Sequence, residues 1–567
     1  MSRWVAAVLA VSLVAPATAA RAEHGGSSSG QLEVVGHLDR AGLGMLPGDT
    51  ATDLWAHGGF AYIGTVADQG CPSGRTGVRI VDISDPSDPE QVGLIRSPEG
   101  TRANDMKVAH LATPAFRGEV LVHTIEPCVR GAEGGISIYD VSDPARPKAL
   151  AESLLGVPVH NTFVYRQGER AYLLAVDNVS ARDVRIVEIT DPSRPQPVAA
   201  TGQPDWSGLE VIEGTVTLHD VWALEVGDRV FAYLSYWDAG LVMLDITDPA
   251  RPVYLGDSAY RDPDPLSGDV PEGNGHTGVP TADGRLVITG DEDDVVYRMV
   301  LEFEGVSHPA TEATFSTPIA SLPGDLLTGK VIWTGGRGCS AGAIRPASSP
   351  EDIALVLRGA CPFHRKARSA AAKGYAAAVV ANEPGDDLVT MGAPGGERAE
   401  IPALLVGEST GEAMRTASPN GHLSARSIFN GSGYLRVLDV TQPEAMVELG
   451  RFATENVFAD PPPPGRSRTM HNAAVRGRRA YISWYGEGMR VVDFSSCRPG
   501  RGESSCTPTE VAHFVDDRRG SDFWGVYLHD HPDGRTYILG SDRQSGLWVF
   551  ALPETRRSRS PTSARPL

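Results

Sequence analysis

The sequence predicts a mainly β protein, a seven-bladed β-propeller that is interrupted by one α/β domain. Three observations lead to this fold class. A strand–turn–strand phrase ending in Asp-Pro recurs along the chain, its copies lie roughly fifty residues apart, and residues 295–427 lack it.

The recurring phrase marks one hairpin in each blade. Examples are GVRIVDISDP from Gly77, GISIYDVSDP from Gly135 and GLVMLDITDP from Gly240. Apolar residues alternate along a strand, Asp-Pro ends that strand, and a second short apolar run follows the turn.

A second pair of strands precedes each Asp-Pro hairpin, as in HDVWALEVGDRVFAYLSYWD from His219. Together the two pairs give four strands in each of seven units, which is typical of propeller blades. The last unit ends after its third strand, but QLEVVGHL from Gln31 matches a fourth-strand phrase. We therefore expect the N-terminal strand to complete blade seven, which would cover an exposed sheet edge.

Strands and helices alternate in the region without the phrase. Residues 353–357 and 376–381 read as buried strands, and residues 362–373 read as an amphipathic helix between them. The region falls between the second and third strands of blade five, so we expect it to leave the propeller on the face where the innermost strands begin.

The N-terminal segment of the chain predicts export. An apolar run from Trp4 to Val14 follows Arg3 and is itself followed by small residues, as in a cleaved signal peptide. We expect a secreted or extracytoplasmic protein without a membrane span. The predicted segments are a signal peptide at 1–22, a flexible linker at 23–30, blades one to five (first part) at 31–294, the inserted domain at 295–427, the rest of blade five to blade seven at 428–552, and a disordered tail at 553–567.

Two families resemble parts of the chain. RIVDISDP, ISIYDVSDP and LVMLDITDP resemble the LVIVD-repeat propellers, a resemblance that implies a fold and no assured catalytic residues. The insert resembles the protease-associated (PA) domain in its VLRG strand, its CPFHRKARSA helix start and its IPALLV strand. That resemblance implies a non-catalytic domain that contacts proteins or peptides, here placed over the channel face.

Six cysteines are expected to be oxidised outside the cytoplasm. Their places in the blade map and the insert favour three disulfides. The predicted pairs are Cys497–Cys506, Cys339–Cys361 and Cys71–Cys128.

Composition and motifs exclude several functions. The net charge of −20, with 51 Lys and Arg against 71 Asp and Glu, argues against nucleic-acid binding. The chain has no HExxH, P-loop or strand-linked GxGxxG motif. The string GESTG at 407–411 satisfies GxSxG, but Ser409 falls where a helix should start and is interpreted as an N-cap.

Histidines recur at one structural position, the start of the innermost strand in blades three to six. These residues are His160, His219, His276 and His471. Alignment of the blades puts Thr52, Asn104 and Trp524 at the same level of the channel. Acidic residues at the ends of second strands, or beside a histidine, are candidates to support the imidazoles or line the channel rim: Asp177, Asp220, Asp238, Asp291, Glu292 and Glu487.

Two interpretations of the histidines remain open at the level of sequence. Converging imidazoles could bind a divalent transition metal such as Fe, Zn or Cu, or each could simply hydrogen-bond the neighbouring blade. The first expectation for function is a secreted binding or scaffold propeller with a non-catalytic PA domain. The alternative is a metal-dependent enzyme with its site at the channel mouth, whose catalytic residues the sequence does not identify.

Overall fold

The computed structural model describes residues 32–552, except 68–74, 130, 210–215, 259–272, 294–295, 387, 390, 394–396 and 461–464. The expected signal peptide, linker and tail lie outside the described residues. In the described part of the chain, no helix combines the length and apolar character needed to cross a membrane.

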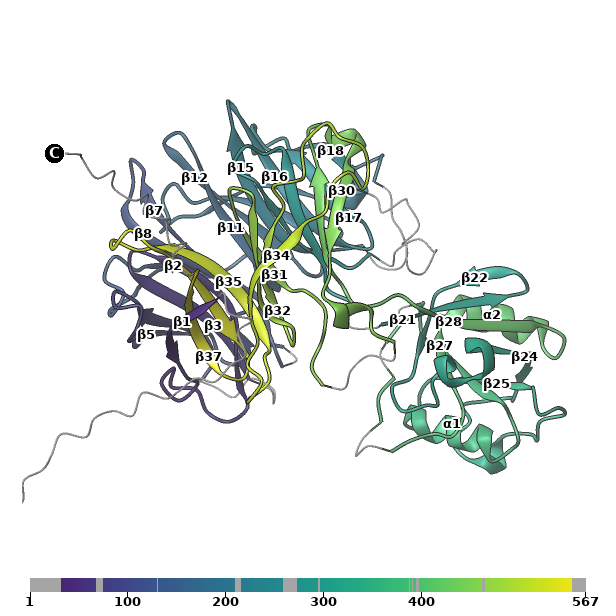
Figure 1. The fold of residues 1–567 in the computed structure, drawn as a ribbon. Helices are drawn as coiled ribbons and strands as arrows, with labels where there is room; N and C mark the ends of the chain where they lie inside the picture. The colour runs from purple at the N-terminus through teal and green to yellow at the C-terminus, as the bar shows by residue number, and fades with distance from the viewer. Residues whose placement is uncertain are drawn as a thin grey trace, which may run out of the picture.

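The repeats fold into seven antiparallel blades (Figure 1). Blade one contains β2 (Asp49–His57), β3 (Phe60–Ala67), β4 (Gly77–Asp82) and β5 (Glu90–Arg96). Blade two contains β7 (Met106–Ala112), β8 (Arg117–Pro127), β9 (Gly135–Asp140) and β10 (Lys148–Leu154), and the short β6 (Thr101–Arg102) also pairs with β8. Blade three contains β11 (Val159–Gln167), β12 (Arg170–Asp177), β13 (Val184–Glu188) and β14 (Gln196–Thr201).

The remaining blades follow the same order, with one interruption. Blade four contains β15 (Thr217–Val226), β16 (Arg229–Trp237), β17 (Gly240–Asp245) and β18 (Val253–Asp257). Blade five contains β19 (Gly275–Pro280), β20 (Leu286–Asp291), β29 (Leu435–Asp439) and β30 (Val447–Phe452). Blade six contains β31 (Asn472–Arg476), β32 (Arg479–Trp484), β33 (Gly488–Asp493) and β34 (Thr509–Phe514). Blade seven contains β35 (Phe523–Asp530), β36 (Thr536–Asp542), β37 (Gly546–Ala551) and β1 (Glu33–Leu38).

The N-terminal strand closes the ring of blades. β1 pairs antiparallel with β37, with His37 opposite Trp548. The first strand of the chain thus completes the last blade, and the predicted fold class is confirmed.

The aspartate that ends the third strand of a blade, three residues before the Asp-Pro dipeptide, has a local structural role. Asp82 Oδ1 accepts a hydrogen bond from the Ser84 N–H at 2.8 Å, which ties the end of the strand to the turn. The same contact recurs at the corresponding aspartates: Asp140 to Ser142, Asp245 to Thr247, Asp439 to Thr441, and Asp493 to Ser495. This repeated turn explains why Asp ends the third strand in most blades.

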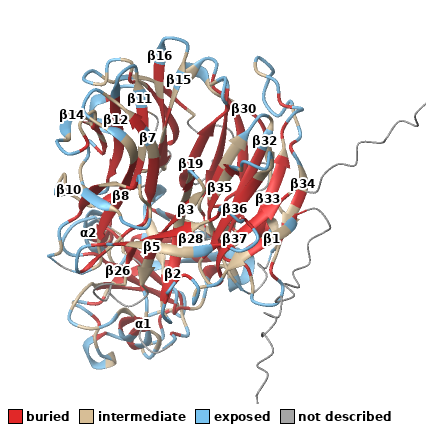
Figure 2. Ribbon diagram, turned by 90° about the vertical axis from the view of Figure 1, so that its left-hand side faces the viewer, coloured by how far each residue is buried: buried red, intermediate tan, exposed pale blue. Residues whose placement is uncertain are grey.

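Apolar side chains between neighbouring blades form the core. One cluster joins blades three and four and includes Leu174, Ile186, Leu234 and Leu244, all fully buried. Figure 2 shows the blade strands as mostly buried and the connecting turns as exposed. The alternating pattern of the repeat is therefore the pattern of burial between blades.

The inserted domain is an eight-stranded sheet with two α-helices. Its strand order is β22-β21-β28-β24-β25-β26-β27-β23, and β24 to β27 run parallel to one another. The strands are β21 (Tyr297–Phe303), β22 (Val306–His308), β23 (Ala310–Glu312), β24 (Leu326–Trp333), β25 (Ile353–Leu357), β26 (Ala377–Ala381), β27 (Ala403–Val406) and β28 (His422–Phe429). The helices are α1 (Phe363–Ala371) and α2 (Glu408–Ala417). Short 3-10 turns occur at Gln203–Asp205, Ile319–Ser321, Pro323–Asp325, Ala341–Ala343, Pro443–Ala445 and Glu455–Phe458.

The strand–helix–strand order expected in the insert is confirmed, but the role expected for Ser409 is wrong. Helix α2 begins at Glu408 and its N-cap is Gly407. Ser409 lies in the first helical turn, where its N–H donates to Asp386 Oδ1 at 2.7 Å. The carboxylate of another loop therefore takes the capping role that we assigned to the serine.

The insert leaves blade five on the histidine side of the propeller. Asp291, which ends β20, pairs with Gly275, the residue before His276. In Figure 1 the inserted domain lies to the lower right of the blades and is joined to them near β21 and β28. The connection therefore leaves from the expected face, and the domain is displaced to one side of the propeller.

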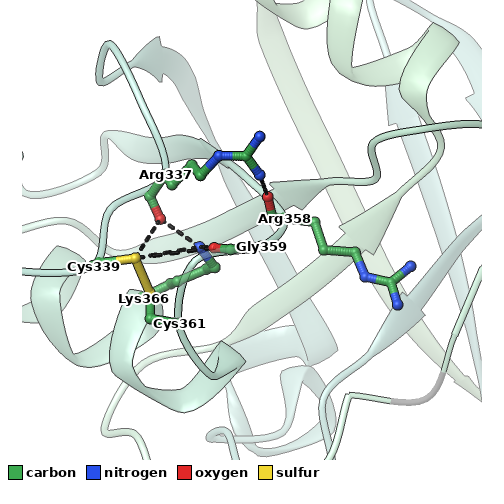
Figure 3. The surroundings of a disulfide bond; sticks show 6 residues. All are labelled: Arg337, Cys339, Arg358, Gly359, Cys361 and Lys366. Atoms are coloured by element: carbon green, nitrogen blue, oxygen red, sulfur yellow. Dashed lines mark hydrogen bonds between the residues drawn. A yellow bond between two sulfur atoms is a disulfide. The ribbon is translucent and has the colours of Figure 1, made fainter.

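Two of the three predicted disulfides are confirmed, Cys339–Cys361 and Cys497–Cys506. Cys71 lies outside the described residues, so its pairing with Cys128 stays a prediction. Figure 3 shows Lys366 beside the first disulfide, where its Nζ donates to the carbonyl oxygens of Arg337 and Gly359 at 2.5 and 2.7 Å. Burial, with the nearby Arg337 charge, lowers the pKa of this lysine to about 8. Disulfide and lysine together join the two loops that precede α1.

The Cys497–Cys506 bond offers a direct test of stability. The bond closes a loop with a sequence separation of 9. Its loss in a Cys497→Ser, Cys506→Ser variant is expected to lower the free energy of unfolding by about 2 to 3 kcal/mol, because the unfolded chain gains entropy. Urea unfolding of both proteins measures the difference. The urea midpoint of the wild-type protein should also fall when the protein is unfolded under reducing conditions. Equal midpoints for the wild type and the variant would contradict the prediction.

Candidate functional site at the channel mouth

A backbone irregularity sets the direction of the ring residues. The register of the innermost strand shifts at this level in five blades, for example between Leu218 and Asp220 in β15 and between Gly275 and Thr277 in β19. Each shift is a β-bulge that adds one residue and re-aims the side chains beside it. Two successive residues, such as His219 and Asp220, can therefore both face the channel.

The four predicted histidines come together as a continuous arc. Ring centroids lie 4.4 Å apart for His160 and His219, 3.9 Å for His219 and His276, and 4.2 Å for His276 and His471. Trp524 continues the arc at 4.3 Å from His471. We call His160, His219, His276 and His471 the histidine ring.

Three of the four ring histidines bond to a neighbouring blade through Nδ1, and His219 Nδ1 receives no hydrogen bond from any described residue. His276 Nδ1 donates to the carbonyl oxygen of His471 at 3.0 Å, and His471 Nδ1 donates to that of Trp524 at 2.6 Å. His160 Nδ1 contacts the carboxylate of Glu126. A proton fixed on Nδ1 leaves the Nε2 lone pair available. The two interpretations of the sequence are thus compatible, because in three of the histidines one nitrogen joins the blades and the other faces the ring interior.

The Nε2 atoms cluster with the carboxylate of Glu292. His160 Nε2 lies 2.9 Å from His219 Nε2. The Glu292 carboxylate oxygens lie 3.4 Å from His276 Nε2 and 3.8 Å from His471 Nε2. The ligand atoms of His219, His276 and Glu292 all lie within 4.8 Å of one another. Two nitrogens bound to one tetrahedral zinc ion at about 2.0 to 2.1 Å would be about 3.3 Å apart, so the ring has nearly the dimensions of a metal site.

The protonation of His219 and His471 fits metal binding. Burial and the neighbouring histidines hold the pKa of His219 and His471 well below the ordinary value, so both imidazoles are neutral near pH 7. Burial also opposes charge on His160, but the Glu126 carboxylate outweighs it and raises the pKa of this histidine. Burial raises the pKa of Glu292, although the Tyr485 hydroxyl donates a hydrogen bond to its carboxylate.

The acidic candidates separate into different environments. Glu292 contacts the imidazoles, Asp220 lies one level deeper in the channel, and Asp238 lines a pocket beside the ring. The other three are buried ion-pair partners of arginines: Asp177 with Arg185 at 2.6 Å, Asp291 with Arg436 at 3.1 Å, and Glu487 with Arg468 at 2.7 Å. A buried carboxylate is stable only when its charge is compensated, and in these positions arginine compensates it.

Glu126 was missed in the sequence although its position could have identified it. It lies at the end of β8, the second strand of blade two. Asp177 occupies the same position in blade three. Arg102 Nε donates to Glu126 Oε2 at 2.7 Å, so the carboxylate links an arginine to His160. Extending the repeat alignment to blade two would have added this residue to the candidates.

A pocket of about 430 Å³ lies at one end of the ring. His160 and His219 form part of its wall, together with Trp237 and Asp238. The remaining lining residues are Asn178, Thr217 and Leu218. We call this the ring pocket, and it gives a molecule from solvent a path to two of the four imidazoles.

Family profiles match both parts of the chain. The PA domain matches residues 327–414, and the LVIVD repeat matches residues 47–95 and 220–258. The repeat matches fall on blade one and blade four.

Known proteins resemble short parts of the chain or its general fold. E3 ubiquitin-protein ligase Godzilla of Drosophila melanogaster is 44% identical over 68 residues, 12% of this chain and 13% of that protein. E3 ubiquitin-protein ligase RNF13 of Bos taurus is 35% identical over 86 residues, 14% of this chain and 23% of that protein. This chain thus covers less than a quarter of either ligase.

Among solved structures, the Cps50 (Swd1) β-propeller domain of Myceliophteria thermophila is similar to this chain at 10% sequence identity and a TM-score of 0.41. The match covers 92% of this chain and 100% of that one. That likeness is too distant to say anything about function. The profile matches and the sheet topology together show that this chain is a seven-bladed propeller with LVIVD repeats and a PA domain inserted in blade five.

Proposed function

We propose that the histidine ring binds a divalent transition-metal ion, and that the protein is a metal-dependent enzyme with its active site at the channel mouth. The observation that carries this proposal is that the two nitrogens of the imidazoles have different surroundings. The Nδ1 atoms of His160, His276 and His471 are engaged by Glu126 or by backbone carbonyls, while Nε2 atoms of the ring gather beside Glu292. Histidines that hold a metal commonly donate their second nitrogen in this way.

The ring pocket favours a catalytic over a purely structural metal. Structural zinc sites are closed by four protein ligands, whereas catalytic sites keep a position for water or substrate. Here the pocket reaches His160 and His219, while His276 and His471 are buried. A metal at the ring would therefore be accessible from the side of the ring pocket, where Trp237 and Asp238 would contact the substrate.

The composition of the ligands suits zinc, iron or copper. Imidazole binds each of these ions, and one carboxylate offsets part of the positive charge. A bound ion would supply Lewis-acid or redox chemistry. The chain itself would hold the imidazoles in one tautomer and limit access of water to one side.

We place this activity outside the cytoplasm, with the PA domain as a second, binding function. Two disulfides fit an oxidising compartment, and the predicted signal peptide would direct the chain there. The match to the PA domain supports contact with a protein or peptide partner. Because the domain is attached on the histidine side, such a partner would be brought to the face that bears the ring pocket.

Metal content tests the proposal directly. Untagged protein is stripped with a chelator, incubated separately with Zn²⁺, Fe²⁺ or Cu²⁺, desalted and analysed for bound metal. We expect one ion per chain in the wild-type protein and none in a His219→Ala, His276→Ala variant. The matched control is His513→Ala, which removes an imidazole that pairs with Glu510 in blade six, away from the ring.

Cobalt spectroscopy separates an open site from a closed one. Co²⁺ bound at the ring should change its visible absorption when azide is added, because azide would occupy the open position. Absence of metal in the wild-type protein would overturn the proposal of a metal site. A Co²⁺ spectrum that does not change when azide is added would support the metal site. It would overturn the proposal of an enzyme, because the metal would have no open position.

A further inference from the structure

A second cavity lies deeper in the channel, beyond the histidine ring. Its volume is about 220 Å³. The lining residues come from the innermost strands of six blades: Asp53, Leu54, Trp55, Lys107, Asp220, Val221, Trp222, Thr277, Val279, Pro280, Asn472, Ala473, Ala474, Val475, Arg476, Val526, Tyr527 and Leu528. It extends toward Arg476, the last residue of β31, and so toward the face opposite the ring. We call it the channel cavity.

Side-chain size explains why the cavity is there. Three residues past the ring position, blades one, three, four and seven place Trp55, Phe163, Trp222 and Tyr527. These rings contact their neighbours around the channel, with centroids 4.4 Å apart for Trp55 and Tyr527 and 4.6 Å for Phe163 and Trp222. Blades five and six place Val279 and Ala474 at the same level and leave the space open.

The polar end of the cavity has more negative than positive charge. Lys107 Nζ contacts Asp105, whose other oxygen accepts from the Thr162 N–H and hydroxyl at 2.8 Å each. Asp105 is therefore fully compensated. Among the described residues, Asp53 and Asp220 form no ion pair with any cationic side chain.

The hydrogen bonds that these two carboxylates accept come from neutral donors, which do not compensate their negative charge. Asp53 accepts from Asn472 Nδ2 at 2.9 Å and from the Leu54 N–H at 3.1 Å. Asp220 accepts from the Val221 N–H at 2.7 Å and from the Thr277 hydroxyl at 3.4 Å. Burial, only partly offset by Lys107, raises the pKa of Asp53 to about 7. Both carboxylates would be stabilised by an added positive charge.

A further unpaired acceptor lies next to the histidine ring, outside the lining of the cavity. Asn161 follows His160 and is buried, and its Nδ2 donates to the carbonyl oxygen of His219 at 3.3 Å. Its Oδ1 receives no hydrogen bond from any described residue. A protonated primary amine offers three donors and no acceptor, which complements the carboxylates of Asp53 and Asp220 in the lining.

We propose that the channel cavity binds a small organic cation bearing a primary ammonium group. The ammonium would pair with Asp53 and Asp220, and its carbon chain would lie against Trp55, Trp222 and Tyr527. Aromatic faces attract cations as well as alkyl groups, and Lys107 already lies 5.2 Å from the centre of the Trp55 ring. The cavity is smaller than the usual ligand pocket of about 300 to 1,000 Å³, so the ligand would be a short amine.

A neutral sugar fits the same cavity less well. Aromatic walls and carboxylates also occur in sugar sites, but a sugar would leave the charges of Asp53 and Asp220 uncompensated. A bare divalent metal would satisfy the carboxylates but make no use of the aromatic wall. Both ligands are therefore outcomes of the test.

Calorimetric titration of the full-length protein at pH 8 tests the proposal. The probes are n-butylammonium, the uncharged n-butanol, methyl glucoside and Mg²⁺. Of these four probes, we expect only n-butylammonium to show saturable binding. Asp53→Asn should weaken it by about thirtyfold, because the variant removes one of the two charges that pair with the ammonium. The control Asp88→Asn, which changes an exposed aspartate in blade one, should bind like the wild type.

A second variant leaves the carboxylates in place. Ala474→Leu fills part of the cavity and should abolish binding while the protein remains folded by circular dichroism. Binding of methyl glucoside or Mg²⁺ in place of the amine would overturn the proposal, as would equal binding of n-butanol. Retention of amine binding in both variants would also overturn it. Metal content of the Asp53→Asn protein is measured in parallel, so that loss of the histidine-ring metal is distinguished from loss of the amine.

Discussion

Zinc-loaded protein is expected to unfold about 5 °C above the metal-free protein, and a His276→Ala, His471→Ala variant is expected to lose this difference. An ion at the ring would be held by imidazoles from blades three, four, five and six. It would add one common bond to four blades that already meet through their side faces and through hydrogen bonds of the ring. At a free-metal concentration about a thousand times Kd, binding to the native state adds roughly 4 kcal/mol to the free energy of unfolding. The expected shift is moderate because a chain of this size unfolds with a large entropy.

Differential scanning calorimetry of each protein, with Zn²⁺ and with chelator, measures the effect. The quantity compared is the shift within each protein, because loss of the Nδ1 hydrogen bonds to His471 and Trp524 also lowers the stability of the metal-free variant. His513→Ala serves as the control and should keep the full shift. An undiminished shift in the ring variant would show that zinc stabilises the protein from another site.

Arg436→Met is expected to destabilise the protein by about 3 to 5 kcal/mol. Arg436 is buried and donates to Asp291 at 3.1 Å and to Glu448 at 2.9 Å. Its guanidinium also lies 4.3 Å from the centre of the Tyr434 ring. The substitution keeps much of the side-chain volume but removes the charge that compensates a buried carboxylate, which is strongly destabilising.

The matched control uses the same acceptor in a more exposed setting. Arg451 Nε forms an ion pair with Glu448 Oε1 at 2.8 Å, and 28% of the Arg451 side chain is exposed. Arg451→Met should therefore lower the free energy of unfolding by about 1 kcal/mol or less. Urea unfolding of both variants and the wild type provides the comparison. Equal effects of the two substitutions would contradict the role assigned to the buried pair.

The repeat made the propeller predictable. The Asp-Pro phrase combines the alternation of a buried strand with an aspartate that accepts the N–H of its own turn, as Asp82 does from Ser84. Both properties are local, so they can be read along the chain. The N-terminal strand was also predictable, because QLEVVGHL has the pattern of the strand that the last blade lacks.

The candidate site was predictable in outline only. Alignment of the repeats gave the level of the four histidines, since equivalent positions in a closed ring share one height along the channel. It did not distinguish Glu292, which contacts the imidazoles, from Glu487, which pairs with Arg468. Both follow a second strand, and only the positions of the surrounding arginines separate them. Glu126 shows the same limit, because its partner His160 belongs to the next blade.

Sequence by itself determined the order of the strands, the closing strand, the place of the PA domain and the residues at the channel mouth. Each of these depends on periodic or local signals. Only the tertiary structure decided which nitrogen of each imidazole faces the ring interior, which carboxylates are compensated by arginine, and where the channel is filled or open. Those properties depend on contacts between blades, where residues more than fifty positions apart meet, as His276 meets the carbonyl oxygen of His471. The bulges that aim the ring residues leave no signature in the repeat phrase, because they depend on how each innermost strand pairs with its neighbour.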